Sequence, residues 1–369
     1  MGDKQYWVAF NITHGIGPAK LRALIHHFGD LGAAWRAGEA ALRECGLDRR
    51  AIRSVLAARE QVDLARVMGQ LEAAGVQVLT WDDADYPTRL RNVLDAPPVL
   101  YVHGGLEPAD EWAVAIVGTR NASVYGREVT HTLAHALGRA GVTIVSGLAR
   151  GIDRVAHVAA LEAGGRTIAV LGSGVDRVYP AEHKQLAKAI RESGAVVSDY
   201  ALGTPPEARN FPPRNRIISG LSLAVVIVEA GERSGALITA EYAADQGREV
   251  FAVPGSILSK RSRGTNRLIR DGVRPVLSAE DILEELNMQL VAEHKVARAE
   301  LPANRTEAAI MEHLGAEPLH VDELTVLTSL PVSEVSSTLA LLELKGRVRQ
   351  VGGMHYVLAR EERASYVVE

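Results

Sequence analysis

A regular alternation of apolar strands and helical segments begins at Ala113 and constrains this chain more than any other feature. The strands are apolar on both faces, and helices separate them, which is typical of a parallel sheet covered by helices on both sides. The expected strands are 113–117, 142–145, 167–171, 195–197, 223–228, 250–253 and 274–277. The expected helices are 125–140, 155–163, 182–192, 215–221, 236–246, 266–271 and 280–286. The fold class is therefore α/β, with a Rossmann-like doubly wound parallel sheet.

The flanking regions have different patterns. Residues 1–75 predict a small helical domain of the helix-hairpin-helix or SAM-like type, and residues 76–286 contain the Rossmann-like domain. Residues 287–304 lose the periodicity and are expected to form a linker. Residues 305–369 show three helical patterns followed by two short strands, the order of a winged-helix domain.

The turn Gly15–Lys20 lies between an apolar stretch, 7–12, and a helical pattern that begins near Pro18. Glycines followed by Pro18 are typical of a helix start, so a helix is expected to begin there. Two interpretations stay open. The turn is either a hairpin whose backbone N–H groups hold a phosphate, or a tight connection within a helical domain.

Composition excludes several classes of protein. The chain has 369 residues and a formal net charge of −4, so it is not a uniformly basic, histone-like protein. Cys45 is its single cysteine, which excludes an internal disulfide framework and a multi-cysteine zinc site. No apolar run approaches the ~20 residues of a membrane span, and the first residues lack the apolar stretch of a signal peptide. We expect a cytoplasmic protein without a membrane partner.

The residues after the strands indicate where a ligand binds, because ligands of parallel sheets bind beyond the carboxyl ends of the strands. Glycine, small hydroxyl residues and arginine recur there, and such turns approach phosphates closely and present helix N-termini to them. Gly-rich turns are also common without any ligand. The candidate phosphate-binding residues are Gly118, Thr119, Arg120, Ser146, Gly147, Arg150, Gly172, Ser234, Gly235 and Gly255.

A second candidate segment follows the fourth strand. Arg214 and Arg216 flank Asn215 at a helix start, and Phe211 precedes them. Guanidinium groups that bind phosphates, an aromatic ring that stacks on a base and an amide that reads a base edge are features of single-stranded nucleic-acid binding. Alternatively, Phe211 belongs to the core and the arginines are solvated. Lys184 and the basic residues between Lys260 and Arg270 would extend the same positive surface.

Catalytic and cofactor signals are weak. His131 and His135 have the spacing of a metal pair, but no third ligand is evident, so a helix face without metal is favoured. Asp153 and His157 are one helical turn apart, and Asp153 is better explained as a helix cap than as a catalytic acid. No dinucleotide motif, Walker lysine or nucleophile elbow is present. We expect no catalytic residues, no metal and no cofactor.

Together these motifs resemble the DNA-processing protein A family (DprA, also Smf) over about residues 80–285. The resemblance is carried by Gly118–Arg120, Ser146–Asp153 with Ala156-His157, Leu171–Pro180, Phe211–Ser222, Ser234–Ala240 and Phe251–Gly255. His183, where asparagine is usual, and Asp199, where glutamate is frequent, depart from the family pattern.

The resemblance implies a single-stranded-DNA-binding protein of natural transformation and DNA uptake. Such a protein protects incoming strands and helps to load the RecA recombinase. It works as a homodimer through its Rossmann-like domain and is not an enzyme. The alternative is a nucleotide-hydrolysing enzyme of the lysine-decarboxylase-like Rossmann family. Its Pro-Gly-Gly-x-Gly-Thr-x-x-Glu motif is matched distantly by Ser234, Gly235, Thr239 and an offset Glu241. For the winged helix, Glu334 and Glu343 in the expected reading helix favour a protein contact over duplex binding.

Overall fold

The computed structural model describes residues 4–286, 305–314, 318–344 and 348–358, so the expected linker 287–304 lies outside the described residues. The chain divides into two compact units, residues 1–291 and 292–369. Each unit is described by itself.

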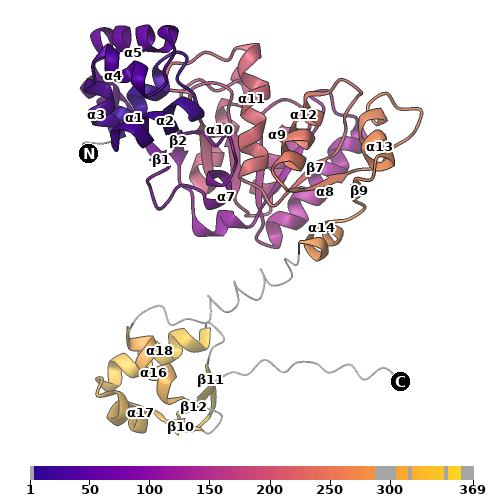
Figure 1. Ribbon diagram of the computed structural model, residues 1–369. Helices are drawn as coiled ribbons and strands as arrows, with labels where there is room; N and C mark the ends of the chain where they lie inside the picture. The colour runs from indigo at the N-terminus through magenta and orange to yellow at the C-terminus, as the bar shows by residue number, and fades with distance from the viewer. Residues whose placement is uncertain (1–3, 287–304, 315–317, 345–347, 359–369) are drawn as a thin grey trace. The chain divides into compact units, whose positions relative to one another are not determined.

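The larger unit contains a nine-stranded sheet in the order β1-β2-β6-β5-β4-β3-β7-β8-β9 (Figure 1). The strands from β6 to β9 are parallel to one another, which confirms the predicted doubly wound sheet. Their bounds are β3 (Ala113–Val117), β4 (Thr143–Ser146), β5 (Thr167–Val170), β6 (Ala195–Ser198), β7 (Ala224–Ile227), β8 (Glu249–Ala252) and β9 (Arg274–Pro275). All five residues of β3 are buried, as expected for a central strand.

The stretches that precede the sheet in the sequence also join it. β1 (Val76–Thr80) and β2 (Val99–Gly104) pair antiparallel, and β2 pairs antiparallel with β6. Residues 76–110 therefore extend the sheet at one edge.

Helices cover both faces of the sheet. One face packs against α8 (Val124–Arg139), α9 (Ile152–Glu162), α10 (Lys184–Ser193) and α14 (Ala279–Glu285). The other packs against α7 (Thr88–Arg91), α11 (Phe211–Gly220) and α12 (Gly235–Asp245), while α13 (Arg263–Arg270) follows β8. Side chains alternate between the faces. In β3, Val114 and Ile116 belong to one core cluster, whereas Ala115 and Val117 belong to the other.

The front of the chain is helical, as predicted, and α2 begins at Pro18. Asp30, Asp48 and Asp63 cap three of its helices by accepting hydrogen bonds from backbone N–H groups. Apolar residues such as Phe10 and Leu24 share one core with Tyr101 of β2. The helices are α1 (Lys4–Ile12), α2 (Pro18–Phe28), α3 (Leu31–Arg36), α4 (Glu39–Glu44), α5 (Arg49–Gln61) and α6 (Leu64–Ala73).

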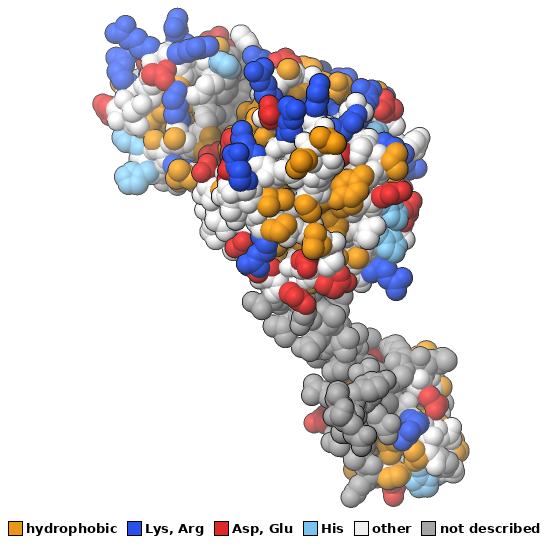
Figure 2. Space-filling view, turned by 90° about the vertical axis from the view of Figure 1, so that its right-hand side faces the viewer, with side chains coloured by type: hydrophobic (Ala, Val, Ile, Leu, Met, Phe, Trp, Pro, Cys, Tyr) orange, Lys and Arg blue, Asp and Glu red, His pale blue; other side chains and the backbone are white. Residues whose placement is uncertain are grey.

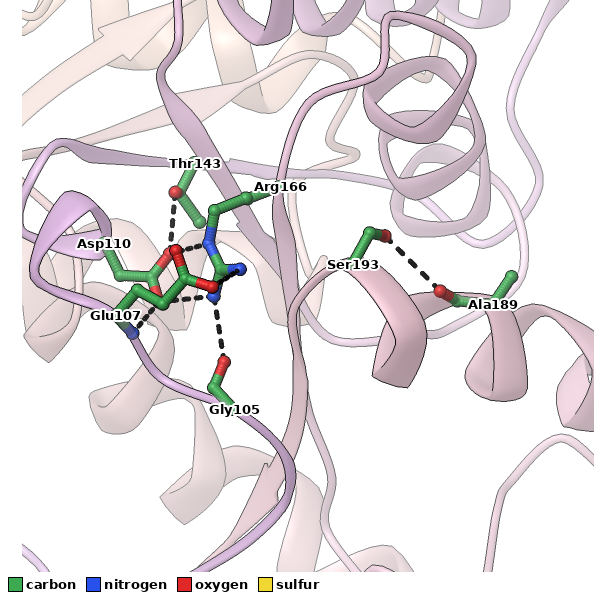
Figure 3. Close-up of polar contacts among 7 residues, drawn as sticks. All are labelled: Gly105, Glu107, Asp110, Thr143, Arg166, Ala189 and Ser193. Carbon is green, nitrogen blue, oxygen red and sulfur yellow. Dashed lines mark hydrogen bonds and ion pairs between the residues drawn. The ribbon is translucent and has the colours of Figure 1, made fainter. Parts of the chain in front are cut away.

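A cluster of polar side chains around Arg166 stabilises the edge of the sheet where the central strands begin (Figure 3). Arg166, directly before β5, donates to Asp110 at 2.9 Å and to Glu107 at 2.7 Å. Asp110 also accepts a hydrogen bond from Thr143 at the start of β4. Because these residues lie at the amino ends of the strands, the cluster stabilises the edge opposite to the one where a ligand is expected.

The smaller unit has the predicted winged-helix order. It contains α16 (Arg305–His313), β10 (Leu319–His320), α17 (Val321–Thr328), α18 (Val332–Leu344), β11 (Val348–Gly352) and β12 (His355–Leu358). Val335, Leu339 and Leu342 of α18 are buried in its core. Among the described residues, no single helix is long and apolar enough to cross a membrane. The bent pair α17 and α18 passes that test of length and composition together, with a bend of 113°.

Candidate functional site

A pocket of about 730 Å³ lies at the carboxyl ends of β3 and β7. The chain proceeds from β3 to β4 on one side and returns through β7 on the other, so this is the position where the strand order reverses. Eight of the predicted residues line the pocket: Gly118, Thr119, Arg120, Phe211, Arg214, Asn215, Ser234 and Gly235. Seven do not: Ser146, Gly147, Arg150, Gly172, Lys184, Arg216 and Gly255.

Two turns that are distant in the sequence form one side of the pocket. Thr119 donates its backbone N–H to the carbonyl oxygen of Glu229 at 2.7 Å. The buried carboxylate of Glu229 accepts hydrogen bonds from the backbone N–H and hydroxyl groups of Ser123 at 2.9 and 2.6 Å. This pairing fixes the turn after β3 against the turn after β7. It leaves Arg120 exposed on the pocket rim.

The first turn of α12 also lines the pocket. The Ser234 hydroxyl accepts a hydrogen bond from the backbone N–H of Ala236 at 3.3 Å, and Asn215 donates its side-chain amide to the carbonyl oxygen of Gly235 at 3.3 Å. A Cβ built on Gly235 would have no atom within 4 Å, so this glycine borders open space. The helix start therefore presents a positive dipole to the pocket.

Two aromatic rings lie side by side in the pocket. The Phe211 ring centre is 5.7 Å from that of Tyr179, with an angle of 47° between the planes. Tyr179 is 44% exposed, and the guanidinium carbon of Arg120 lies 5.5 Å from the Phe211 ring centre. Sequence reasoning did not identify Tyr179 as a site residue. Its position after the expected strand 167–171, among the strand-end residues where a ligand was predicted to bind, could have identified it.

Arg214 is not the exposed phosphate ligand that the sequence suggested. It is 4% exposed and donates from Nη1 to the carbonyl oxygens of Gly147, at 2.8 Å, and Val170. Burial lowers the pKa of Arg214 to about 10, so the guanidinium is still charged at neutral pH. Arg214 lines the pocket as part of its floor.

Asp153 also belongs to this floor. It is 6% exposed, and its carboxylate accepts a hydrogen bond from the backbone N–H of Ala149 at 3.2 Å. Burial raises the pKa of Asp153, while the positive charge of Arg214 opposes that rise. The two buried groups therefore stabilise each other's charged forms. Asp153 therefore holds the loop after β4, but it is not the helix cap that the sequence suggested, because it is the second residue of α9 and Gly151 occupies the cap position.

Arg216 lies on the opposite side of its helix. It is bound to Asp199 at 2.9 Å and to Asp95 at 3.1 Å, with a side chain only 12% exposed. The sequence placed the helix start at Asn215, but α11 begins at Phe211, because prolines are tolerated in a first helical turn. Residues two apart on a helix point about 200° apart. Arg214 and Arg216 therefore cannot share one rim.

Three other predicted residues also lie away from the pocket. Arg150 forms a double hydrogen bond with the carboxylate of Glu182 at 2.8 and 2.7 Å. Lys184 is exposed at the start of α10. The buried Ser146 hydroxyl donates to the carbonyl oxygen of Ile116 at 2.7 Å, within the sheet.

The glycines at the strand ends divide into two groups. A Cβ on Gly147 would lie 2.6 Å from Nη2 of Arg214, so this glycine makes room for a protein side chain. Gly118, Gly172 and Gly255 likewise face protein atoms, on Ile152, Phe211 and Ser262. Packing within the protein is therefore enough to explain these four glycines, and their use for close phosphate approach stays a prediction. Of the predicted glycines, Gly235 is the one that faces open space.

The three histidines that the sequence analysis considered as metal ligands or catalytic groups have partners inside the protein. His131 bonds Glu162 at 2.9 Å and stacks on His135. His157 bonds the hydroxyl of Thr167 at 2.7 Å, not the carboxylate of Asp153. Within the part of the chain that the structure describes, no cluster of three or more potential metal ligands is found.

The basic segment after β8 approaches the turn that carries Arg120. Arg261 donates from Nε to the carbonyl oxygen of Asn121 at 2.8 Å, and Lys260 is exposed beside it. Arg263, Arg267 and Arg270 on α13 each form an ion pair with a neighbouring carboxylate. Figure 2 shows Lys and Arg side chains gathered on the upper part of the larger unit.

Comparisons with known proteins identify the family of the chain. Residues 77–287 match the family model described as DNA recombination-mediator protein A, and residues 294–354 match the DprA winged helix domain. Protein Smf from Synechocystis is 36% identical over 391 residues, which covers 96% of this chain and 98% of that protein.

Two solved structures are similar. The crystal structure of DNA processing protein A from Streptococcus pneumoniae has a TM-score of 0.68 and 34% identity, covering 77% of this chain and 99% of that one. The Helicobacter pylori protein has a TM-score of 0.53 and 29% identity, covering 58% of this chain and 96% of that one. The structure of the Helicobacter pylori protein concerns its single-stranded DNA binding mode.

Proposed function

This chain belongs to the DNA recombination-mediator protein A family, also called DprA or Smf, and from that membership and its pocket we propose that it binds single-stranded DNA. The observation that carries the proposal is the exposed Arg120 close to the ring of Phe211, which itself lies beside the ring of Tyr179. Single strands are bound by cations that hold phosphates and by rings on which unpaired bases stack. The single-stranded DNA binding mode of the family relative from Helicobacter pylori supports the same ligand.

Each pocket residue has a role in this proposal. Arg120 and the start of α12 bind backbone phosphates. Phe211 and Tyr179 stack on bases, and the amide of Asn215 contacts a base edge. Arg214, which is buried, positions Phe211, since its guanidinium carbon lies 5.9 Å from the ring centre. Double-stranded DNA keeps its base faces covered, so the stacking energy is available to single strands alone.

The biological role that follows is natural transformation and DNA uptake. In this role the protein protects incoming strands and helps to load the RecA recombinase in the cytoplasm, acting as a homodimer through its Rossmann-like domain. The family membership supports this role. Light scattering of the purified protein tests the dimer, and RecA-driven strand exchange with and without the protein tests the loading.

Two further proposals concern domain organisation. Residues 1–75, 76–286 and 305–369 act as a helical module, the DNA-binding domain and a winged-helix module for protein contact, with 287–304 as a linker. The shared hydrophobic core of the first two makes them one folding unit.

We also propose that the protein is not an enzyme. Among the described residues, Asp153 is the one acidic residue that lines the pocket, and its carboxylate is bonded to the loop backbone. Glu241, the distant match to the motif of the nucleotide-hydrolysing family, is exposed on α12 and does not line the pocket. Incubation with nucleoside monophosphates tests this proposal, since release of free base would overturn it.

A gel-shift titration of labelled single strands and the matching duplex, at several salt concentrations, tests the DNA proposal. We expect the single strand to bind more tightly, and its affinity to fall as salt rises because phosphate contacts release counterions. Equal affinity for the two forms, or affinity independent of salt, would contradict the proposed use of the pocket.

A further inference from the structure

A second pocket, of about 400 Å³, lies beside the first, where the helical front of the chain meets the sheet. One wall is the turn Asn11–Ile16 between α1 and α2. The other is the segment that follows β6, from Asp199 to Asn210. We call this pocket the hairpin groove. The sequence alone left the function of the Gly15–Lys20 turn open, and this groove is where the turn faces the sheet.

Hydrogen bonds between the two walls fix the shape of the groove. Asn11 donates its side-chain amide to the carbonyl oxygen of Asp199 at 3.2 Å. The hydroxyl of Tyr101 donates to the side-chain oxygen of Asn11 at 2.8 Å. The amide of Asn11 is therefore held from both sides. The groove is thus a built feature of the larger unit, with a fixed distance between its walls.

A single stretch of chain separates the hairpin groove from the first pocket. Pro206, Ala208 and Phe211 line the first pocket, whereas Glu207, Arg209 and Asn210 line the groove. Neighbouring residues of one short turn thus face opposite sides. A ligand that leaves the first pocket over this turn passes directly from the Phe211 ring to the groove.

Charges around the groove favour a polyanion. Its two carboxylates are already neutralised, because Asp199 is paired with Arg216 and Glu207 with Arg209. The Arg209 side chain is 81% exposed on the dividing turn. At the other wall, Arg50 bonds the His14 ring at 3.2 Å and forms no ion pair with a described residue. Arg50 is available to a phosphate, and the exposed Arg209 reaches one by exchanging its surface ion pair with Glu207.

The interior of the groove is polar. Tyr200, Thr204 and Asn210 line it with a phenol ring, a hydroxyl and an amide. An unpaired base can use such groups for hydrogen bonds and for contact with the ring. An apolar peptide helix would leave them without partners, which is energetically unfavourable.

We propose that the hairpin groove binds the next nucleotides of the same DNA strand that occupies the first pocket. This inference rests on the proposed function. In it, Arg209 and Arg50 contact phosphates on the two rims, and a base enters the groove between them. The helical front of the chain is then part of the DNA site, and the strand path crosses the turn Ala208–Asn210.

The test compares oligothymidylates of about 4 and about 16 nucleotides on the full-length protein, by fluorescence anisotropy over a range of salt. The doubly substituted variant Arg209→Ala/Arg50→Ala should bind the short strand as the parent does. Its affinity for the long strand should fall roughly tenfold, since bonds to charged groups are lost. The salt slope should fall by about 0.7 for each phosphate contact removed.

Arg43→Ala is the matched control. Arg43 is exposed, lines neither pocket and is paired with Glu39 at 2.5 Å, much as Arg209 is paired with Glu207. A second variant, Thr204→Trp, fills the groove without changing its charge. This variant should lower the affinity for the long strand and leave the affinity for the short strand unchanged. An unchanged melting temperature would show that the variant is folded.

The outcomes distinguish failure of the proposed function from failure of the inference about the hairpin groove. If the parent binds neither oligonucleotide, the proposed function itself is wrong. If the parent binds both, but the doubly substituted variant loses no more long-strand affinity than Arg43→Ala, then the groove does not bind DNA. Equal losses for both lengths would place Arg209 and Arg50 at the first pocket and would also overturn the inference.

Discussion

The guanidinium carbon of Arg120 lies 5.5 Å from the centre of the Phe211 ring, on the exposed side of the pocket. The guanidinium carbon of Arg214 lies 5.9 Å from the centre of the same ring. One ring thus contacts both an exposed arginine, Arg120, and a buried arginine whose Nη1 is bonded to two backbone carbonyl oxygens. The next predictions depend on this difference.

Arg120→Ala should weaken single-strand binding for all sequences and lower the salt slope by about 0.7 to 1, because one phosphate contact is lost. The melting temperature should not change, since Arg120 is exposed. Arg139→Ala, in the last turn of α8 and far from the pocket along that helix, is the control. If Arg120→Ala binds single strands as tightly as the parent, Arg120 does not bind a phosphate. Anisotropy titrations at three salt concentrations measure both quantities.

Phe211→Ala should lose about 1–3 kcal/mol of binding free energy, roughly tenfold or more in affinity, because a stacked base loses its partner. The salt slope should stay the same. Phe211→Leu separates stacking from packing, since leucine restores an apolar side chain but has no ring. If Phe211→Leu binds as well as the parent, or if Phe211→Ala mainly lowers the melting temperature, Phe211 is a core residue.

Arg214→Met should destabilise the fold by roughly 3–5 kcal/mol, the range for a buried charge network that loses one member. The carbonyl oxygens of Gly147 and Val170 lose their donor, and Asp153 loses the nearby positive charge that favours its ionised form. Urea denaturation measures the loss. Arg120→Met, the same change on the exposed side of Phe211, should leave stability near that of the parent. Equal stability of the two variants would contradict the buried role of Arg214.

His157 makes stability depend on pH. Burial lowers its pKa to about 3 in the folded protein, against 6.5 for an ordinary histidine. Below pH 6.5 the unfolded chain therefore takes up a proton that the folded chain does not. This group should remove about 1.4 kcal/mol of stability per pH unit as the pH falls. His157→Gln should show a shallower decline between pH 7.5 and 5.5 in urea denaturation. Parallel profiles would show that His157 is not the responsible group.

A shortened protein that ends at Leu286 should keep most of its single-strand affinity, because both proposed DNA pockets lie in the larger unit. The helix α18 contains Glu334 and Glu343 and no Lys or Arg, so it would repel a polyanion. The basic exception in this part of the sequence is the edge 345–349, of which Lys345 and Arg347 lie outside the described residues and Arg349 is exposed on β11. Loss of most affinity by a shortened protein that is still folded and dimeric would contradict this prediction.

Local patterns in the sequence were sufficient for the architecture. The double-sided apolar strands predicted the parallel sheet, and strand ends rich in glycine and arginine predicted the edge where the pocket lies. The three helices and the hairpin of the winged helix were also predicted. These features follow from periodicity, because each element forms from residues that are neighbours in the chain. Residues 76–110 were the exception, since their antiparallel pairing with a distant strand has no local signal.

The sequence by itself determined the fold class, the helical front, the winged helix and the edge of the sheet that carries the pocket. Only the tertiary structure decided which arginines are free. Arg214 is bonded to Gly147, 67 residues away, and Arg216 to Asp95, 121 residues away. Arg120 forms no hydrogen bond or ion pair with another described residue, and it stays exposed beside the Phe211 ring. Whether a guanidinium group binds a ligand depends on its burial and on its partners, and residues far apart in the chain supply both.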